Sequence, residues 1–311
     1  MPEISIVIPT RNRGGEAAQT AAAVLCDPVD MELVVVDQSD GDTAFQALQP
    51  LLRDPRLRVV RSAQRGASNA RNAGVAATSA PILAFTDDDC RPEPGWASKL
   101  LAVFRENPGA ALVFGRVTLP TGADPDGFAA SFEPRERFQR GSVPLPPPEG
   151  ELGIGANLAI RRHVLAQLGG FDALLGPGAP FFKAAEETDL LIRALHAGYT
   201  VVNAAECEAV HLNVRTGRDV RRLHVTYQFA VGAAFGKHAR VSGLGGLRDC
   251  ARWASYYVRK TVRDIVHLRR PRPGVLVYFA AGALFTFRYG IEPTGRNLCE
   301  RAGRRGGQRA T

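Results

Sequence analysis

The first 105 residues alternate between apolar segments of strand length and segments with helical periodicity. We expect strands at 4–8, 32–36, 57–60 and 82–86, and helices near 16–25, 67–77 and 95–105. This alternation is typical of an α/β fold, a mostly parallel sheet with helices on both faces. In such sheets ligands bind in the crevice outside the carboxyl ends of the strands. The residues that follow each strand are therefore the first candidates for a functional site.

Polar side chains follow three of the predicted strands. Thr10 and Arg11 follow the first strand, Asp37 follows the second, and the triplet Asp87–Asp89 follows the strand that ends at Thr86. Acidic triplets are common in solvated turns, but this one directly follows a hydrophobic strand. Three adjacent carboxylates repel one another, and a divalent cation that carries phosphate oxygens would relieve the repulsion. The sequence therefore predicts metal and phosphate chemistry at this edge of the sheet.

A second group of acids stands at the start of a predicted helix in the middle of the chain. Glu186, Glu187 and Asp189 begin an amphipathic segment at 186–195, which should end before Gly198. Acids in the first turn can simply interact favourably with the helix dipole. The residues alone leave open whether this group is functional.

Composition places the chain among globular proteins with one large domain or two small ones. It has 311 residues, of which 45% are hydrophobic and 23% charged. Five widely and irregularly spaced cysteines favour reduced thiols in a cytosol over a disulfide framework or a cysteine zinc site. The chain enters its first strand at once, without the pattern of a signal peptide, so we expect a cytoplasmic protein.

The basic charge is concentrated near the C-terminus. Residues 240–311 contain 15 Lys and Arg against 4 Asp and Glu, a net +11, so residues 1–239 carry −3 of the total of +8. A basic amphipathic segment at 252–270 precedes an apolar segment at 275–287, whose thirteen residues are short of the roughly 20 that span a bilayer. We expect peripheral contact with an anionic membrane surface at the inner face of the cell membrane, with a dimer-buried or ordinary core helix as alternatives. The end of the chain, 301–311, should be disordered.

Six segments, in order and with consistent spacing, resemble glycosyltransferase family 2, the inverting enzymes with the GT-A fold. They are 5–12, 35–39, 66–74, the triplet Asp87–Asp89 with Pro92, 186–190 and 209–211. The resemblance implies a Rossmann-like, mostly parallel sheet flanked by helices, followed by a C-terminal helical extension. With the Pro- and Gly-rich stretch 120–153 as a long loop or linker, we expect a nucleotide-sugar-binding half at 1–119, an acceptor-binding half at 120–240 and a basic helical region at 241–311.

The resemblance also implies roles for individual residues. The nucleotide-binding residues would be Pro9, Thr10, Arg11, Asp37, Arg71, Asp87 and Asp88. Asp37 would accept a hydrogen bond from the imide of uracil or thymine. Asp89 and His211 would hold Mg²⁺ or Mn²⁺. Glu187 would be the base, but the Glu-Asp pair of the family is Glu186-Glu187 here, so the choice among Glu186, Glu187 and Asp189 stays open.

The implied reaction is an in-line transfer of a sugar from a UDP-sugar or dTDP-sugar to a hydroxyl acceptor. The acceptor would be a saccharide or a lipid-linked molecule in cell-surface polysaccharide or glycolipid synthesis, and no nucleic-acid partner is expected. A sugar nucleotidyltransferase is an alternative, but it calls for a Gly-rich basic loop after the first strand, which Thr10–Gly15 matches poorly. A nicotinamide dehydrogenase would need a GxGxxG sequence that is absent. A second alternative is an inactive, membrane-bound assembly factor, favoured only by the unusual Glu187.

Overall fold

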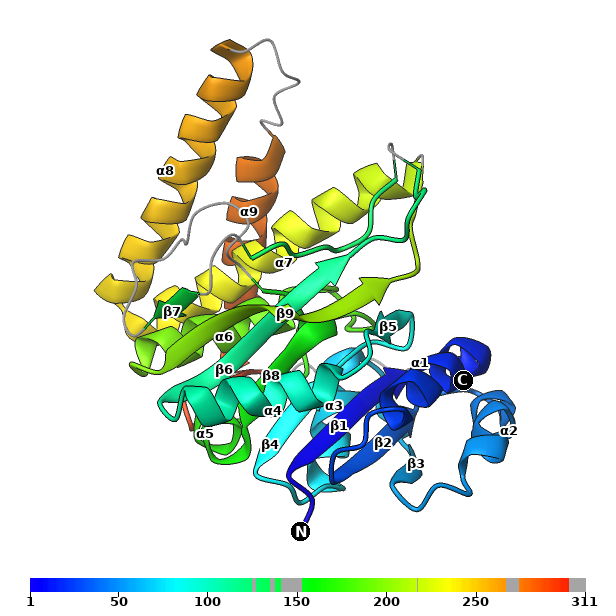
Figure 1. Cartoon of the computed structure of the whole chain (residues 1–311). Helices are drawn as coiled ribbons and strands as arrows, with labels where there is room; N and C mark the ends of the chain where they lie inside the picture. Colours follow the sequence, from blue (N-terminus) through cyan, green and yellow to red (C-terminus); the bar gives the residue numbers. More distant parts are fainter. Residues whose placement is uncertain (125–126, 135–137, 141–152, 217, 267–273, 302–311) are drawn as a thin grey trace, which may run out of the picture.

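A nine-stranded sheet is the centre of the computed structural model in Figure 1. The structure describes residues 1–124, 127–134, 138–140, 153–216, 218–266 and 274–301. The strands are β1 (Ile4–Thr10), β2 (Met31–Asp37), β3 (Leu57–Arg61), β4 (Ile82–Phe85), β5 (Cys90–Pro92), β6 (Ala110–Thr118), β7 (Phe138–Arg140), β8 (Leu158–Arg161) and β9 (Thr200–His211). Their order is β3-β2-β1-β4-β8-β6-β9-β5, and β7 also pairs with β9. A separate pair, β10 (Gly290–Ile291) and β11 (Leu298–Cys299), lies near the C-terminus.

Most strands of the sheet share one direction, as the sequence predicts. β1 to β4, β6 and β9 run one way, while β5, β7 and β8 run the other way. The chain passes from β1 outward to β2 and β3, and then returns to place β4 on the opposite side of β1. This reversal creates a topological switch point between β1 and β4, where α/β sheets bind ligands.

Alternating side chains of β1 enter two different hydrophobic layers. Ile6 belongs to a core cluster shared with α1 (Gly14–Leu25) and α4 (Trp96–Glu106). Val7 belongs to a cluster on the other face with α3 (Ala67–Ala76), α5 (Arg162–Leu168) and α6 (Glu186–His196). Both faces of the sheet are therefore buried by helices, and all seven predicted elements of the first 105 residues are present with ends within two residues. The short helix α2 (Thr43–Leu48) is an addition that the sequence pattern does not predict.

Strands from the two predicted halves lie in one sheet. β4 pairs with β8, and β6 pairs with β9, across the stretch 120–153. That stretch is not all loop, because β7 and a bridge between Val117 and Phe132 fall within it or at its border. Its residues 141–152, like the predicted disordered end at 302–311, lie outside the described residues. The predicted halves 1–119 and 120–240 therefore share one sheet and one fold.

Three helices form the predicted C-terminal extension: α7 (Arg218–Ser242), α8 (Leu244–Val266) and α9 (Gly274–Phe285). Figure 1 shows α8 projecting from the body of the molecule, with α9 beside α7. Glycines let α7 and α9 approach closely, since a Cβ on Gly282 would lie 1.9 Å from the carbonyl oxygen of Phe229 and one on Gly232 would lie 2.0 Å from that of Phe279. No helix among the described residues is both long enough and apolar enough to span a bilayer.

We expect Gly282→Ala to destabilise the fold, because its methyl group must push the backbones of α7 and α9 apart. Overpacking of this kind typically costs about 1–3 kcal/mol. Gly245→Ala, in α8, is the matched control, since a Cβ there has no atom within 4 Å. The free energy of unfolding from urea titrations checks the difference. Equal stability of the two variants would contradict the close contact of α7 and α9.

Candidate functional site

A cavity of about 820 Å³ lies outside the carboxyl ends of β1 and β4, at the switch point of the sheet. The site residues predicted from the sequence that line it are Pro9, Thr10, Arg11, Arg71, Asp87, Asp88, Asp89, Glu186, Glu187 and His211. They come from strand ends and helices up to 202 positions apart in the chain. Among the described residues that line the cavity, Asp37 is missing, although its neighbour Gln38 is present.

The carboxylates that follow β4 are paired with a cation that sequence reasoning missed. Arg13 Nη1 donates to Asp89 Oδ2 at 2.6 Å, and Arg13 Nε donates to Asp88 Oδ2 at 3.1 Å. Thr10 Oγ1 also donates to Asp88 Oδ2, at 2.8 Å. The signal for Arg13 was its place just beyond the first strand, opposite an acidic triplet. Its guanidinium offsets part of the repulsion among the three carboxylates. The sequence alone predicts a metal ion that relieves that repulsion.

Burial and charge act on the two carboxyl groups in opposite directions. Burial raises the pKa of Asp88 to about 7, although Arg13 and Thr10 oppose that shift. Burial alone would raise the pKa of Asp89 too, but His211 and Arg13 outweigh it and leave the pKa below its ordinary value. Asp89 is therefore anionic at neutral pH, whereas Asp88 is only partly ionised there.

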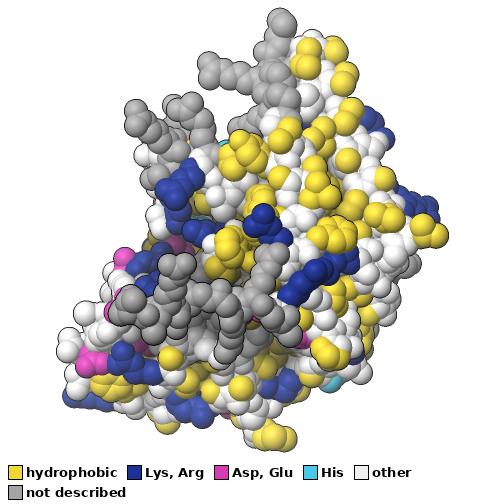
Figure 2. Space-filling model, turned by 180° about the vertical axis from the view of Figure 1, so that it is seen from behind, with side chains coloured by type: hydrophobic (Ala, Val, Ile, Leu, Met, Phe, Trp, Pro, Cys, Tyr) yellow, Lys and Arg dark blue, Asp and Glu magenta, His cyan; other side chains and the backbone are white. Residues whose placement is uncertain are grey.

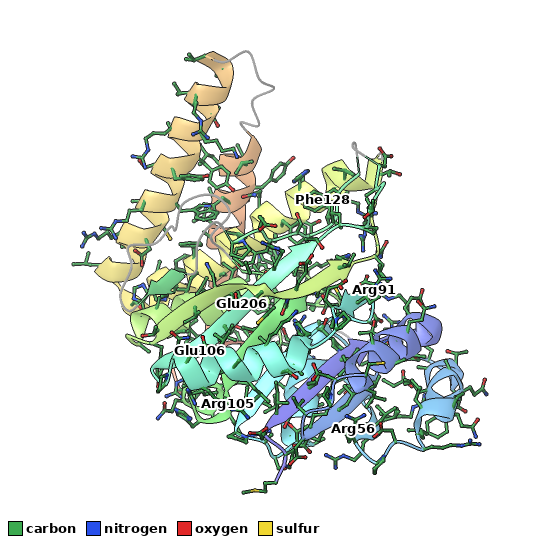
Figure 3. All side chains as sticks on the ribbon, in the orientation of Figure 1. Arg56, Arg91, Arg105, Glu106, Phe128 and Glu206 are labelled. Carbon is green, nitrogen blue, oxygen red and sulfur yellow. The ribbon has the colours of Figure 1, made fainter. Side chains whose placement is uncertain are left out.

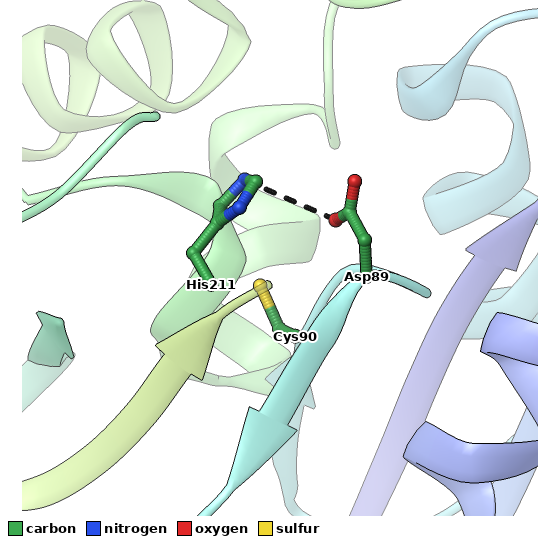
Figure 4. A group of neighbouring side chains, drawn as sticks. All are labelled: Asp89, Cys90 and His211. Carbon is green, nitrogen blue, oxygen red and sulfur yellow. Dashed lines mark ion pairs between the residues drawn. The ribbon is translucent and has the colours of Figure 1, made fainter. Parts of the chain in front are cut away.

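Asp89 and His211 face each other, as Figure 4 shows. Cys90 in β5 pairs with His211 in β9, and this antiparallel register brings the histidine beside the triplet. Asp89 Oδ1 lies 3.9 Å from His211 Nε2, close enough for one ion to contact both. His211 Nδ1 is buried without a hydrogen-bond partner among the described residues. These donors fit a divalent cation, with Mn²⁺ favoured by the imidazole and Mg²⁺ by the carboxylates.

Cys90 lies beside the same two side chains but contributes differently. Its sulfur is close enough to Asp89 and His211 to share an ion with them. Burial, followed by the charges of Asp87 and Asp89, raises the pKa of the Cys90 thiol well above its ordinary value. A protonated thiol is a poor ligand for a hard cation. Cys90 therefore suits packing better than ion contact, and Asp89 and His211 stay the predicted ion ligands.

Arg71 links the acidic triplet after β4 to the start of α6. The side chain is 1% exposed, and its guanidinium contacts Asp87 Oδ1 at 2.8 Å and Glu186 Oε1 at 2.6 Å. Burial alone would lower the pKa of Arg71, but Asp87 and Glu186 raise it above its ordinary value. Removing one partner from a buried pair leaves a charge uncompensated, which is strongly unfavourable. Arg71 and Glu186 thus have an evident structural task in this site.

The three candidate bases differ in what they contact. Glu186 is committed to Arg71. Asp189 accepts from Arg193, 2.7 Å away, and is paired with Lys237; it is not among the lining residues in the part of the chain that the structure describes. Glu187 lines the cavity and is half-buried. Burial and then the charge of Glu186 raise the pKa of Glu187 well above its ordinary value, as suits a proton acceptor.

Aromatic side chains from the C-terminal helices form the opposite wall of the cavity. Tyr227 of α7 and Trp253 and Tyr257 of α8 line it, together with Phe128, which is labelled beside α7 in Figure 3. The ring of Phe128 lies 4.8 Å from that of His224 in α7. Trp253 and Tyr257 both fall in the predicted amphipathic segment 252–270, and their spacing of four residues gave no sign of a role in a pocket. Their rings provide an apolar surface in the same cavity as the carboxylates.

Asp37 is buried with one oxygen left over. Its Oδ1 accepts the backbone N–H of Ser39 at 2.8 Å. Its Oδ2 is buried and has no hydrogen-bond partner in the described ranges. Such an acceptor is costly unless a donor reaches it.

The fold and the cavity define an α/β protein with a ligand crevice at a topological switch point. Comparison with known families makes the class specific, because the sequence model of "Glycosyl transferase family 2" matches residues 5–169. The match covers more than half of the chain, which therefore belongs to glycosyl transferase family 2.

Three similar proteins illustrate the range of relatives. The chain is 27% identical over 205 residues to the pre-mycofactocin glycosyltransferase of Mycobacterium tuberculosis, covering 63% of this chain and 40% of that relative. It is 27% identical over 226 residues to glycosyltransferase AglE of Haloferax volcanii, covering 68% of this chain and 67% of AglE. The mannosyltransferase PcManGT from Pyrobaculum calidifontis, solved in complex with GDP-Man and Mn²⁺, superposes with a TM-score of 0.60 at 16% identity, covering 91% of this chain and 86% of PcManGT. This likeness confirms the predicted GT-A-like fold, while the chain spans less than half of the mycobacterial relative.

Proposed function

We propose that this chain transfers a sugar from a nucleotide diphosphate donor to a hydroxyl acceptor, with inversion. The observation that carries the proposal is the placing of Asp89 and His211 in the same cavity as Glu187. An in-line displacement needs neutralised charge at the leaving group and a base at the acceptor. Glu187, the one candidate base without a committed ion pair among those described, takes the proton of the acceptor hydroxyl. A divalent ion held by Asp89 and His211 would neutralise charge on the departing diphosphate.

The proposed donor is a UDP-sugar or a dTDP-sugar. The Oδ2 of Asp37 has no hydrogen-bond partner in the part of the chain that the structure describes. It supports this choice, because a carboxylate can accept the imide N–H of uracil or thymine. Thr10, Arg11 and the neighbouring Pro9 form the wall of the nucleotide pocket. GDP is the competing nucleotide, since PcManGT was solved with GDP-Man.

The acceptor is proposed to bind between Glu187 and the aromatic wall. Residues 1–119 then serve the donor and 120–240 the acceptor, with Trp253 and Tyr257 of the C-terminal region completing the acceptor side. Aromatic faces suit the apolar faces of a saccharide or the lipid part of a lipid-linked acceptor. A role in cell-surface polysaccharide or glycolipid synthesis follows from such acceptors.

Thermal unfolding with UDP, dTDP and GDP, each with and without Mn²⁺, tests the donor proposal. Binding to the folded state stabilises by about 2.7 kcal/mol at a ligand concentration 100 times Kd. We expect UDP or dTDP to raise Tm, and Mn²⁺ to enlarge the rise. A shift with GDP alone would overturn the role of Asp37. A chain that no nucleotide stabilises would favour the inactive assembly factor.

The exposed face of the C-terminal helices is proposed to rest on an anionic membrane surface. Figure 2 shows hydrophobic side chains gathered beside Lys and Arg in the upper part of the view, where these helices lie. In the second half of α8 the exposed large apolar side chains are Val258, Val262, Ile265 and Val266, and Arg259 and Arg263 are exposed next to them. On and just after α9 they are Val277, Tyr278, Leu284 and Phe287. An apolar stripe flanked by arginines is typical of helices that lie in a membrane interface.

We expect the double variant Val262→Glu/Ile265→Glu to lose binding to vesicles that contain phosphatidylglycerol. Burying one such side chain contributes about 1.5 kcal/mol or more, so vesicle affinity should fall at least about tenfold. Flotation with anionic and with neutral phosphatidylcholine vesicles measures the change. Phe45→Glu is the control, since Phe45 is 43% exposed on α2. Unchanged flotation of the double variant would place membrane contact elsewhere.

A further inference from the structure

Two histidines and an aspartate meet where α8 joins α6 and α7. His196 ends α6, His238 lies near the end of α7, and Asp249 lies in the second turn of α8. Their potential ligand atoms all lie within 4.8 Å of one another. Of the described residues that line the catalytic cavity, none belongs to this cluster. The cluster therefore needs an explanation of its own.

One carboxylate oxygen of Asp249 faces both imidazoles. Asp249 Oδ2 lies 2.6 Å from His196 Nε2 and 3.9 Å from His238 Nε2. Its other oxygen, Oδ1, lies 3.8 Å from Arg252 Nη1. The arginine thus accompanies one oxygen and leaves the other for the histidines. The two imidazole rings have centroids 3.9 Å apart, so all three groups converge on one point.

His238 contributes to this cluster a ring nitrogen that has no hydrogen-bond partner among the described residues. This nitrogen is the buried Nε2, and the residue as a whole is 5% exposed. Its Nδ1 has Ser242 Oγ 3.4 Å away. Leaving a buried ring nitrogen unpaired costs about 1–3 kcal/mol. A hydrogen bond between His196 and Asp249 alone would not relieve that cost.

We propose that His196, His238 and Asp249 bind a divalent transition metal, and that Zn²⁺ is the ion. Two imidazoles and one carboxylate form a common ligand set for zinc. His196 has 34% of its side chain exposed, which gives the ion an entry path and lets a water molecule complete a tetrahedral site.

The bound ion would attach α8 to the two helices that precede it. α8 carries Trp253 and Tyr257 of the aromatic wall, and α6 carries Glu187 at its opposite end. Zinc would therefore fix the aromatic wall relative to the proposed base. Its nitrogen-rich ligands separate it from the Asp89 site, whose carboxylates suit Mg²⁺ or Mn²⁺.

Zinc titration of the metal-free full chain tests the proposal, in an Asp89→Asn background that removes the other ion site. We expect one Zn²⁺ per chain by isothermal titration calorimetry. Losing a supporting residue outside the ligand set typically weakens metal binding about 10- to 100-fold, so His238→Gln, which removes a ligand, should weaken it at least tenfold. His163→Gln is the matched control, because His163 is exposed on α5. Zinc binding that is absent, or equal in the two variants, would leave only a His–Asp hydrogen bond between helices.

Two further measurements, thermal stabilisation by Zn²⁺ and the absorption spectrum of bound Co²⁺, test the site if the His238→Gln variant does not fold. His196→Gln changes an exposed residue, and we expect Zn²⁺ to raise Tm of the Asp89→Asn chain but not of the chain that also carries His196→Gln. Co²⁺ should give the visible absorption of a tetrahedral nitrogen and oxygen site. Equal stabilisation of both chains would overturn the assignment. So would intense thiolate charge-transfer absorption, because it would place the ion on a cysteine.

Discussion

Glu187→Gln should lower the rate of sugar transfer by about a hundredfold or more while donor affinity stays unchanged, because an amide cannot accept the proton of the acceptor hydroxyl. Glutamine keeps the size of the side chain and leaves in place the ion pairs of Arg71 with Glu186 and Asp87. Nucleotide release in the presence of a saccharide or lipid-linked acceptor measures the rate, and calorimetry with the nucleoside diphosphate measures donor binding.

The pH dependence of the rate distinguishes a base from a residue that only positions the substrate. Burial and Glu186 hold the pKa of Glu187 well above its ordinary value. The base must be ionised, so the rate should rise with pH through this raised pKa and fall below it, where the carboxyl group is protonated. The Glu187→Gln variant should lack that limb of the profile. An unchanged limb in the variant would assign it to another group.

Two glutamate variants serve as controls for Glu187→Gln. Glu16→Gln changes an exposed residue of α1 and should leave the rate intact. Glu186→Gln removes the partner of a buried arginine, so it should lower Tm as well as activity. If Glu186→Gln instead lost the rate at full stability and Glu187→Gln retained it, the two roles would be reversed.

Asp89→Asn should abolish both sugar transfer and the Mn²⁺-dependent part of nucleotide binding. The amide removes the anionic oxygen that faces His211 Nε2 across 3.9 Å, and Mn²⁺ and Mg²⁺ need anionic oxygen ligands. A nucleotide at 100 times Kd stabilises the folded state by about 2.7 kcal/mol in total, and the part of the resulting rise in Tm that depends on Mn²⁺ should vanish.

Asp54→Asn is the control for that variant, since Asp54 pairs with Arg56 on the surface. Figure 3 labels Arg56 beside β3, away from the cavity. Retention of the full Mn²⁺-dependent shift in Asp89→Asn would remove Asp89 from the set of metal ligands. Loss of the shift in both variants would point to general destabilisation.

The sequence predicts the donor side of the fold well because its signals are local. The strand predicted at 32–36 contains the continuous apolar run 33–36 between polar residues, and such a run can be recognised without knowing its neighbours. The same holds for the triplet Asp87–Asp89, whose position after a strand already places it at the sheet edge. The resemblance of these segments to one family then predicts that they line a single pocket.

Contacts that depend on tertiary packing were beyond the sequence. β5 has three residues, too few for periodicity, yet its pairing with β9 is what brings His211 to Asp89. The pairing of Arg13 with Asp88 and Asp89 depends on how the loop after β1 folds back. Trp253 and Tyr257 reach the cavity only because α8 packs across it, and their helical spacing is equally compatible with a simple core or membrane face.

Under the proposed function, the shared guanidinium of Arg71 would couple donor and acceptor occupancy thermodynamically. Asp87, on the proposed donor side, and Glu186, beside the proposed base, both form ion pairs with this buried cation. A donor that changes the charge near Asp87 changes the attraction left for Glu186, and this alters the field in which Glu187 ionises. Linkage makes the effect reciprocal, so an acceptor bound at Glu187 must alter donor affinity by the same factor. This ion-pair network, and not a moving lid, would then determine the preferred order of substrate binding.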